Sequence, residues 1–293
     1  MTATADLHLH STASDGADRP AEVVRRAAEL GFATIALADH DTMDGVPEAA
    51  EAAVLIGIEL IPAVEYSTLD GEREIHILGY GLDPDDATLR RELRRLSAGR
   101  FDRAFLMVEK LNEAGVLISW DRVKEIAGDE NVGRPHVARA MQEAGYIREI
   151  KDAFTGAYIA SGGRCYVERV RITPDESIAQ IRAAGGIAVL AHPGRFRSDD
   201  DTVGDEVIER YIVAGLEGLE VFYSRHTAAM EGHYRAMAVR FGLVMTGGSD
   251  DHGANAEPLI GRVRLPYEYV EQLNGAIAAS RARRARHVAN ANA

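Results

Sequence analysis

The chain has 293 residues, of which 46% are hydrophobic, and its formal net charge is −13. This length and apolar content suffice to bury a large core, as one α/β domain or as a domain that carries an insertion. The acidic balance argues against a protein that coats long nucleic acids, because like charges repel. It does not exclude a small anionic substrate, since metal ions and a few arginines reverse the field locally.

The single cysteine, Cys165, cannot form an intrachain disulfide, which favours a cytoplasmic setting. The sequence does not start with a charged segment followed by an apolar stretch, so we expect no signal peptide. It also has no run of about 18 apolar residues, so we expect no membrane span.

The first part of the chain alternates strand and helix patterns. Strands are predicted at residues 5–9, 32–38, 60–64 and 74–80, and helices at residues 20–31 and 46–57. The run 32–38 is apolar throughout, which is typical of a strand buried on both faces. This order of elements predicts a parallel sheet or a barrel.

The middle of the chain is predominantly helical. Helices are predicted at residues 85–115, 121–128 and 135–145, and the next strand at residues 164–170. We therefore interpret residues 98–163 as a helical insertion. The arginines between residues 90 and 103 alternate with acids, which indicates a solvated helix face with i, i+4 ion pairs.

Alternation returns after residue 173. Helices are predicted at residues 174–184, 205–214 and 227–241, strands at 187–191, 216–223 and 243–246, and a last helix from residue 267. We interpret the arginines at 281, 283, 284 and 286 as its solvated face. About seven strands result, which predicts an α/β fold in which residues 1–97 and 164–293 form a seven-stranded (β/α) barrel.

Histidines and carboxylates gather where these strands end. They are His8, His10, Asp15, His40, Glu65, His76, His192, Asp250 and His252. In a parallel barrel, strand ends meet at one rim, where active sites lie. Nitrogen and oxygen donors without sulfur suit Mn, Zn or Fe, and this number would serve two or three ions if Glu65 bridges.

Each part of this set also has a simpler explanation. His8 and His10 could be a chance surface pair, and Asp39 or Asp41 could cap a helix. His192-Pro-Gly could be a turn. The joint pattern favours a metal cluster.

Five of these segments resemble, in order, the motifs of the PHP (polymerase and histidinol phosphatase) family: residues 6–16, 38–42, 64–67, 192–194 and 248–252. The resemblance implies a distorted seven-stranded barrel with its site on the C-terminal rim. It implies one metal held by His8, His10, Glu65 and Asp250, a second by Glu65, His76 and His192, and a third by Asp15, His40 and His252. Leu9 should then point away from the metals.

Residues 133–139 and 223–227 are similar to the branch that acts on 3′,5′-nucleoside bisphosphates, some members of which trim short RNAs from the 5′ end. The resemblance implies that the insertion caps the site and that substrate phosphates lie near Arg134, His136, Ser224, Arg225 and His226. Arg134 could instead belong to a helix start, with Pro135 in its first turn, and Arg225 and His226 could cap a helix. Arg195 is a weaker candidate, more readily explained as solvated.

The expected activity is removal of the 3′-phosphate from a nucleoside 3′,5′-bisphosphate, with exonuclease action on short RNA as an extension. Two metals would lower the pKa of a bridging water, and the resulting hydroxide would attack phosphorus. Arg134 and Arg225 would stabilise the added charge, and His192 or His226 would protonate the leaving alkoxide. The alternatives are another small-molecule phosphatase, such as one for histidinol phosphate, and a non-catalytic metal-stabilised module that binds a nucleic acid or another partner.

Overall fold

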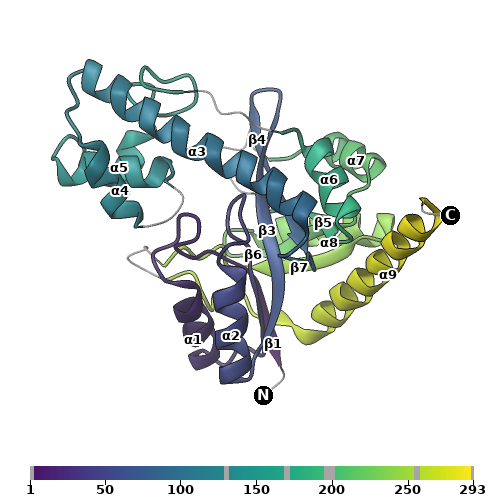
Figure 1. Ribbon diagram of the computed structural model, residues 1–293. Coiled ribbons are helices and arrows are strands. Elements are labelled where there is room, and N and C mark those ends of the chain that lie inside the picture. The colour runs from purple at the N-terminus through teal and green to yellow at the C-terminus, as the bar shows by residue number, and fades with distance from the viewer. Residues whose placement is uncertain (1–2, 129–131, 168–171, 195–201, 254–257, 292–293) are drawn as a thin grey trace.

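The computed structural model describes residues 3–128, 132–167, 172–194, 202–253 and 258–291. One eight-stranded sheet, in the order β7-β6-β5-β4-β3-β2-β1-β8, forms its centre (Figure 1). The strands are β1 (Thr4–Leu9), β2 (Thr34–Leu37), β3 (Glu59–Asp70), β4 (Arg73–Tyr80), β5 (Ile187–Leu190), β6 (Gly218–Tyr223), β7 (Val244–Gly248) and β8 (Leu265–Pro266). The α/β prediction is confirmed, since β1 to β7 correspond to seven of the predicted strands, whereas the two-residue β8 was not predicted.

The sheet closes on itself at one rim. Leu9, at the end of β1, forms an isolated parallel bridge with Asp251, which follows β7. The backbone N–H of Asp250 donates to the carbonyl of His8 at 2.9 Å, and that of His10 donates to the carbonyl of Asp251 at 3.0 Å. These bonds bring the first and last chemical motifs of the chain side by side.

The expectation of a parallel sheet is wrong for β4, which is antiparallel to both β3 and β5. β3 and β4 are joined as a hairpin, whose turn includes Gly71 with a φ of +61°. Because this pairing extends β3 to Asp70, Glu65 lies within the strand rather than at its predicted end. His76 lies in the first half of the antiparallel β4. It still reaches the rim, because β3 extends past the rim before the chain turns back into β4.

Helices cover the outside of the sheet (Figure 1). They are α1 (Pro20–Glu29), α2 (Val46–Ile56), α6 (Pro174–Ala183), α7 (Asp205–Ala214), α8 (Ala228–Phe241) and α9 (Tyr267–Ala291). α1 has Pro20 in its first turn, where a missing N–H costs nothing, and it buries Val23, Val24 and Ala27. Leu9 packs in this same apolar cluster.

The middle of the chain builds a second hydrophobic core, from Ala104 to Cys165. It contains the outer half of α3 (Ala87–Glu113), α4 (Trp120–Ala127), α5 (Arg134–Glu143) and the short 3-10 helix η1 (Ile150–Ala153). The predicted boundary at residue 98 lies inside α3, which runs on from the barrel without a break (Figure 1). The predicted strand at 164–170 is absent from residues 164–167, and residues 168–170 lie outside the described ranges.

The predicted solvated arginine face of α9 is confirmed in part, because Arg281, Arg283 and Arg286 are exposed, but three of the four arginines also contact the barrel. Arg281 donates to the carbonyl of Gly81 at 2.8 Å, Arg283 pairs with Glu217, and Arg284 pairs with Asp86. They fasten the last helix to the barrel, because helix α9 lies along the sheet rather than projecting from it. Within the described ranges, no helix is long and apolar enough to cross a bilayer.

Candidate metal centre

Glu65 is the hub of the rim. Its side chain is fully buried, and imidazole nitrogens approach both of its carboxylate oxygens. Nδ1 of His76 lies 2.7 Å and Nε2 of His192 lies 3.0 Å from Oε1. Oε2 is 3.2 Å from nitrogens of His8, His10 and His40. One carboxylate thus faces five histidines that come from four separate segments of the chain.

The donor atoms fall into three overlapping groups, each within a span of 4.8 Å. The groups are His8, His10, Glu65 and Asp250; His40, Glu65 and His76; and His10, Asp15, His40 and His252. His192 joins them through Oε1 of Glu65. All nine candidate ligands therefore meet at one place. The first group is the one that the family resemblance implies, whereas His40 enters the second group and His10 the third.

The chemistry of the cluster fits bound cations. Nε2 of His8, both ring nitrogens of His10 and Oε2 of Glu65 are buried and have no hydrogen-bond partner. They approach one another to 3.2 Å without hydrogen-bonding geometry. Buried polar atoms are normally satisfied, because leaving one unpaired costs about 1–3 kcal/mol. Divalent ions between these nitrogens and oxygens would satisfy all four atoms.

Backbone strain is concentrated in the same region. Asp41, His192 and Asp250 have φ values of +56°, +28° and +57°, in the region that L-residues other than glycine rarely adopt. Surrounding bonds hold them there: the N–H of Asp41 donates to the carbonyl of Glu65, and its Oδ1 accepts from the N–H of Ser67. Such strain is typical of functional sites, where the fold over-determines a geometry.

Glu220 is a functional residue that the sequence analysis missed. It is fully buried in β6, and its Oε1 lies 3.0 Å from Nδ1 of His8. Its Oε2 accepts from the backbone N–H of His192 at 2.7 Å. Burial raises the pKa of the Glu220 carboxyl, although the adjacent His8 opposes this. The available signal was a carboxylate between Leu219 and Val221, in the apolar part of the strand predicted at residues 216–223.

Other polar side chains hold the ligand loops. Asp39 accepts from the backbone N–H and the hydroxyl of Ser11, both at 2.7 Å, and from the hydroxyl of Ser14. It ties the loop after β1 to the end of β2, rather than capping a helix. The hydroxyl of Tyr223 donates to Oδ2 of Asp250 at 3.0 Å, which orients that carboxylate.

Electrostatics in the metal-free cluster favour ion pairs. Burial tends to raise the pKa of Glu65, but His40 and His76 hold it well below its usual range. Burial lowers the pKa of His10, but the close carboxylates of Asp250 and Glu65 outweigh burial and raise that pKa to about 10. By the same balance, with Glu65 as the main partner, the pKa of His76 rises to about 9. Protons thus occupy the positions that cations would take.

Among the candidate substrate residues, Arg134 reaches the cluster through Glu74. One guanidinium nitrogen of Arg134 lies 3.3 Å from Oε2 of Glu74, and Oε1 of Glu74 lies 3.2 Å from Nε2 of His76. The guanidinium also stacks over Phe154, at 5.6 Å from the ring centre. This ion pair connects the helical insertion to the rim.

His136 supports the start of α5, because its Nδ1 accepts from the backbone N–H of Gly133 at 2.9 Å. The helix-start explanation thus holds for this segment, and it is the helix start that places Arg134 beside the rim.

In the segment after β6, one candidate substrate residue is exposed and two are partly buried. Arg225 is exposed, and the hydroxyl of Ser224 donates to the carbonyl of Ser249. His226 donates from Nδ1 to the carbonyl of Val221 at 2.8 Å and accepts at Nε2 from the N–H of Gly194 at 3.1 Å. Burial lowers the pKa of His226, so the neutral form that these bonds require is favoured. These bonds favour a positioning role for His226, and Arg195 lies outside the described residues.

Known proteins share both the sequence and this architecture. The PHP domain matches residues 6–149. A 3′,5′-nucleoside bisphosphate phosphatase from Chromobacterium violaceum is 36% identical over 85% of this chain and 87% of its own. A 5′-3′ exoribonuclease from Haemophilus influenzae is 36% identical over 86% and 91% of the two chains. A phosphoribosyl 1,2-cyclic phosphate 1,2-diphosphodiesterase from Eggerthella lenta is 31% identical over 85% and 94%.

Among solved structures, a Bifidobacterium adolescentis protein assigned as a metal-dependent phosphoesterase superposes with a TM-score of 0.84 and 31% identity, covering 93% of this chain and 96% of its own. Identity at this level over most of both chains, with the clustered histidines and carboxylates, establishes the family. The chain belongs to the PHP family and is a metal-dependent hydrolase of phosphoester bonds.

Proposed function

We propose that this protein removes the 3′-phosphate from nucleoside 3′,5′-bisphosphates and releases nucleoside 5′-monophosphates. The contact from Arg134 to Glu74 to His76 carries this proposal, because it brings an arginine of the insertion to the edge of the metal cluster. An arginine fork binds a phosphate through two parallel hydrogen bonds. A substrate with two phosphates needs such a second anion site, and the substrate named for the Chromobacterium relative has two.

The nine rim residues would hold two or three divalent ions, with Glu65 bridging between groups. Imidazole and carboxylate donors suit Mn, Zn or Fe, according to supply. Such ions, when bound, activate a water and neutralise the charge of the phosphoryl oxygens.

The protein's own groups would orient the substrate. Arg134 would bind the phosphate that stays on the nucleoside, and exposed Arg225 would approach from the segment after β6. His226 uses both ring nitrogens for backbone bonds, so of the two histidines considered as proton donor only His192 has a ring that faces the cluster. Its ring centre is 5.2 Å from that of His76.

The helical insertion would act as a cap. Residues 98–163 were assigned to it from the sequence, and its separate hydrophobic core fits a unit that closes over bound substrate. We also propose short RNA as a second substrate, since a relative of comparable similarity is an exoribonuclease. The single Cys165 is buried, so stability needs no disulfide, which fits work in the reducing cytoplasm.

Two other functions are less well supported. A histidinol-phosphate phosphatase would have no use for an arginine at the tip of the insertion, because its substrate carries one phosphate. A metal-stabilised binding module without turnover would use the same ligand atoms, but the relatives that match most of the chain are named as a phosphatase, an exoribonuclease and a diphosphodiesterase.

The test is phosphate release from adenosine 3′,5′-bisphosphate by metal-stripped protein reconstituted with Mn²⁺. A short 5′-phosphorylated RNA, histidinol phosphate and an aryl phosphate run in parallel. We expect rapid release of phosphate and formation of AMP. Turnover of the aryl phosphate alone would support hydrolase activity but contradict the proposed bisphosphate substrate. A cyclic phosphodiester would then be the next substrate to test.

A further inference from the structure

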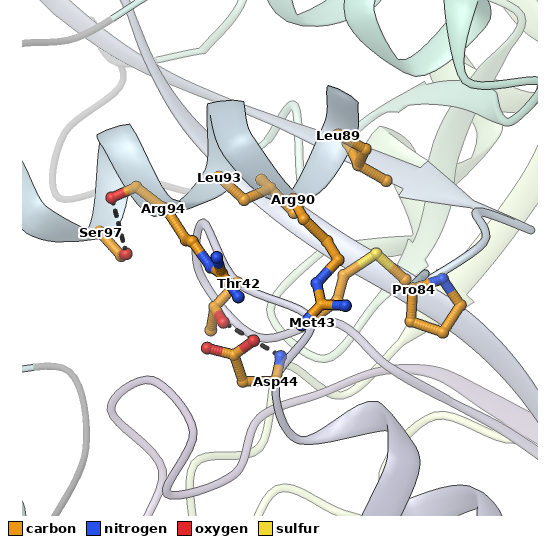
Figure 2. A pocket seen from close by; sticks show the side chains of 9 residues that line it. All are labelled: Thr42, Met43, Asp44, Pro84, Leu89, Arg90, Leu93, Arg94 and Ser97. Carbon is orange, nitrogen blue, oxygen red and sulfur yellow. Dashed lines mark hydrogen bonds between the residues drawn. The ribbon is translucent and has the colours of Figure 1, made fainter. Parts of the chain in front are cut away.

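A pocket lies beside the rim, between the loop after β2 and the first turns of α3 (Figure 2). It is a shallow hollow that opens to solvent, and its empty volume of about 320 Å³ includes solvent space outside the protein surface. Thr42, Met43 and Asp44 line it on the loop side, and Pro84, Leu89, Arg90, Leu93, Arg94 and Ser97 line it on the side of α3. None of these residues belongs to the metal cluster.

The pocket has a net positive lining, because it contains two arginines, Arg90 and Arg94, and one carboxylate, Asp44. Among the described residues, no carboxylate lies within ion-pair distance of Arg94. Arg90 has only a 3.6 Å contact with Asp85, whose side chain is 88% exposed, and such surface pairs contribute little. Figure 2 shows both guanidinium groups directed toward the loop that contains Thr42.

The neighbouring arginines do have carboxylate partners, although these partners are not at the i, i+4 spacing that was predicted. Arg91 and Arg95 both approach Glu92, at 3.5 Å and 3.3 Å. The side chain of Arg91 is 70% exposed and does not line the pocket. Unpaired positive charge in this stretch therefore lies on the pocket side of α3, in a protein whose net charge is −13.

The pocket also adjoins the reaction site. Thr42 follows the candidate ligand His40 by two residues, so their Cα atoms lie at most about 7.6 Å apart. The base of the pocket is apolar, because Met43, Leu89 and Leu93 are buried. Arg94, which has no carboxylate partner among the described residues, and the weakly paired Arg90 stand above this apolar base, an arrangement that suits an anionic phosphate with the apolar face of its sugar against the base.

We propose that this pocket binds a backbone phosphate of a short RNA, downstream of the nucleotide whose phosphate reacts at the metal centre. This inference rests on the proposed function and extends it to the RNA substrate. A nucleoside bisphosphate places its two phosphates at the metals and at Arg134, so it has no further phosphate for Arg94. The pocket would thus add affinity for oligonucleotides and set their path along α3.

The experiment measures binding of a 5′-phosphorylated, 3′-fluorescein-labelled tetranucleotide RNA by fluorescence anisotropy. The protein is stripped of metal with EDTA so that the RNA stays intact, and potassium chloride is varied. We expect Arg94→Gln to weaken binding about three- to tenfold, as for loss of one partly exposed charged contact. The dependence of log K on log salt should fall by about 0.7 in slope, the value for one phosphate contact on a single strand. Arg94→Lys should recover most of the loss.

Arg91→Gln is the matched control, because it removes the same charge from the same helix outside the pocket. Equal losses of RNA affinity for Arg91→Gln and Arg94→Gln would show a general charge effect and contradict binding at the pocket. Undiminished binding by Arg94→Gln, or no binding by the unmodified protein at low salt, would also overturn it. Hydrolysis of adenosine 3′,5′-bisphosphate by the unmodified protein is measured separately, so failure of the proposed function is distinguishable from failure of the pocket.

Discussion

The rim of the barrel and the helical insertion differ in the contacts from which they are built. Rim residues come from distant parts of the chain, are buried, and are strained at three positions. The insertion is built from contacts close in sequence around its own core, and the ion pair from Arg134 to Glu74 connects its helix α5 to the rim cluster. The sheet therefore fixes the geometry of the candidate metal ligands, and under the proposed function the separately packed insertion would contribute to substrate binding. Changes at the rim should therefore abolish activity, and changes in the insertion should alter affinity.

The largest effect is expected for Glu65→Ala. Five histidines face this carboxylate, so its loss should remove the bridge between metal groups and lower kcat by more than about a hundredfold, beyond the usual effect of outer residues. Metal content by mass spectrometry and phosphate release measure the two effects. Exposed Glu72, in the turn of the same hairpin, is the control through Glu72→Ala. Full metal content and rate in Glu65→Ala would show that the hub is misassigned.

The next effect is expected for Glu220→Gln. The carboxylate accepts from both His8 and the N–H of His192, and an amide would turn one of these contacts into a meeting of two donors. We expect metal affinity or kcat to fall by about 10- to 100-fold.

Glu217→Gln, just before β6, alters an ion pair with Arg283 and should leave metal affinity unchanged. If both variants bound metal as tightly as the unmodified protein, the Glu220 carboxylate would not be needed for metal binding.

Metal affinity should depend on pH. The raised pKa values of His10, about 10, and His76, about 9, mean that these rings are protonated at neutral pH without metal. Ligation needs neutral imidazole, so binding releases protons, and affinity should rise about tenfold per pH unit for each proton released. Calorimetry of Mn²⁺ binding from about pH 6 to about pH 8, in buffers of different ionisation heat, measures both quantities. An affinity independent of pH would mean that the metal-free rings are neutral.

The smallest effect is expected for Arg134→Ala, which tests the insertion. We expect KM for adenosine 3′,5′-bisphosphate to rise about tenfold with kcat little changed, because one charge-assisted contact to the bound substrate is lost. Arg139→Ala, exposed on the same helix, is the control. In a double-mutant cycle, Glu74→Gln should be non-additive with Arg134→Ala, because the two side chains are in contact. A fall in kcat with unchanged KM would mean that Arg134 acts in the catalytic step. That result would contradict the proposed role of the insertion in substrate binding alone.

Most helices and strands, the metal cluster and the family were predictable from the sequence alone. Apolar runs and caps located most helices and strands, since periodicity and end signals are local properties. Pairs such as His8 and His10, or Asp250 and His252, stand where strands end, and their donor types alone indicated a metal cluster. Motif order then indicated the family.

Tertiary structure decided the rest, because it depends on pairing between distant segments. The direction of β4 and the length of β3 follow from their hairpin, so the places of Glu65 and His76 within their strands could not be read from local patterns. Glu220 and Glu74 become functional only through the neighbours that folding brings to them. The same holds for the arginines of α3 and α9: charge pattern is local, but whether a guanidinium meets a carboxylate, a carbonyl or an open pocket depends on what packs against the helix.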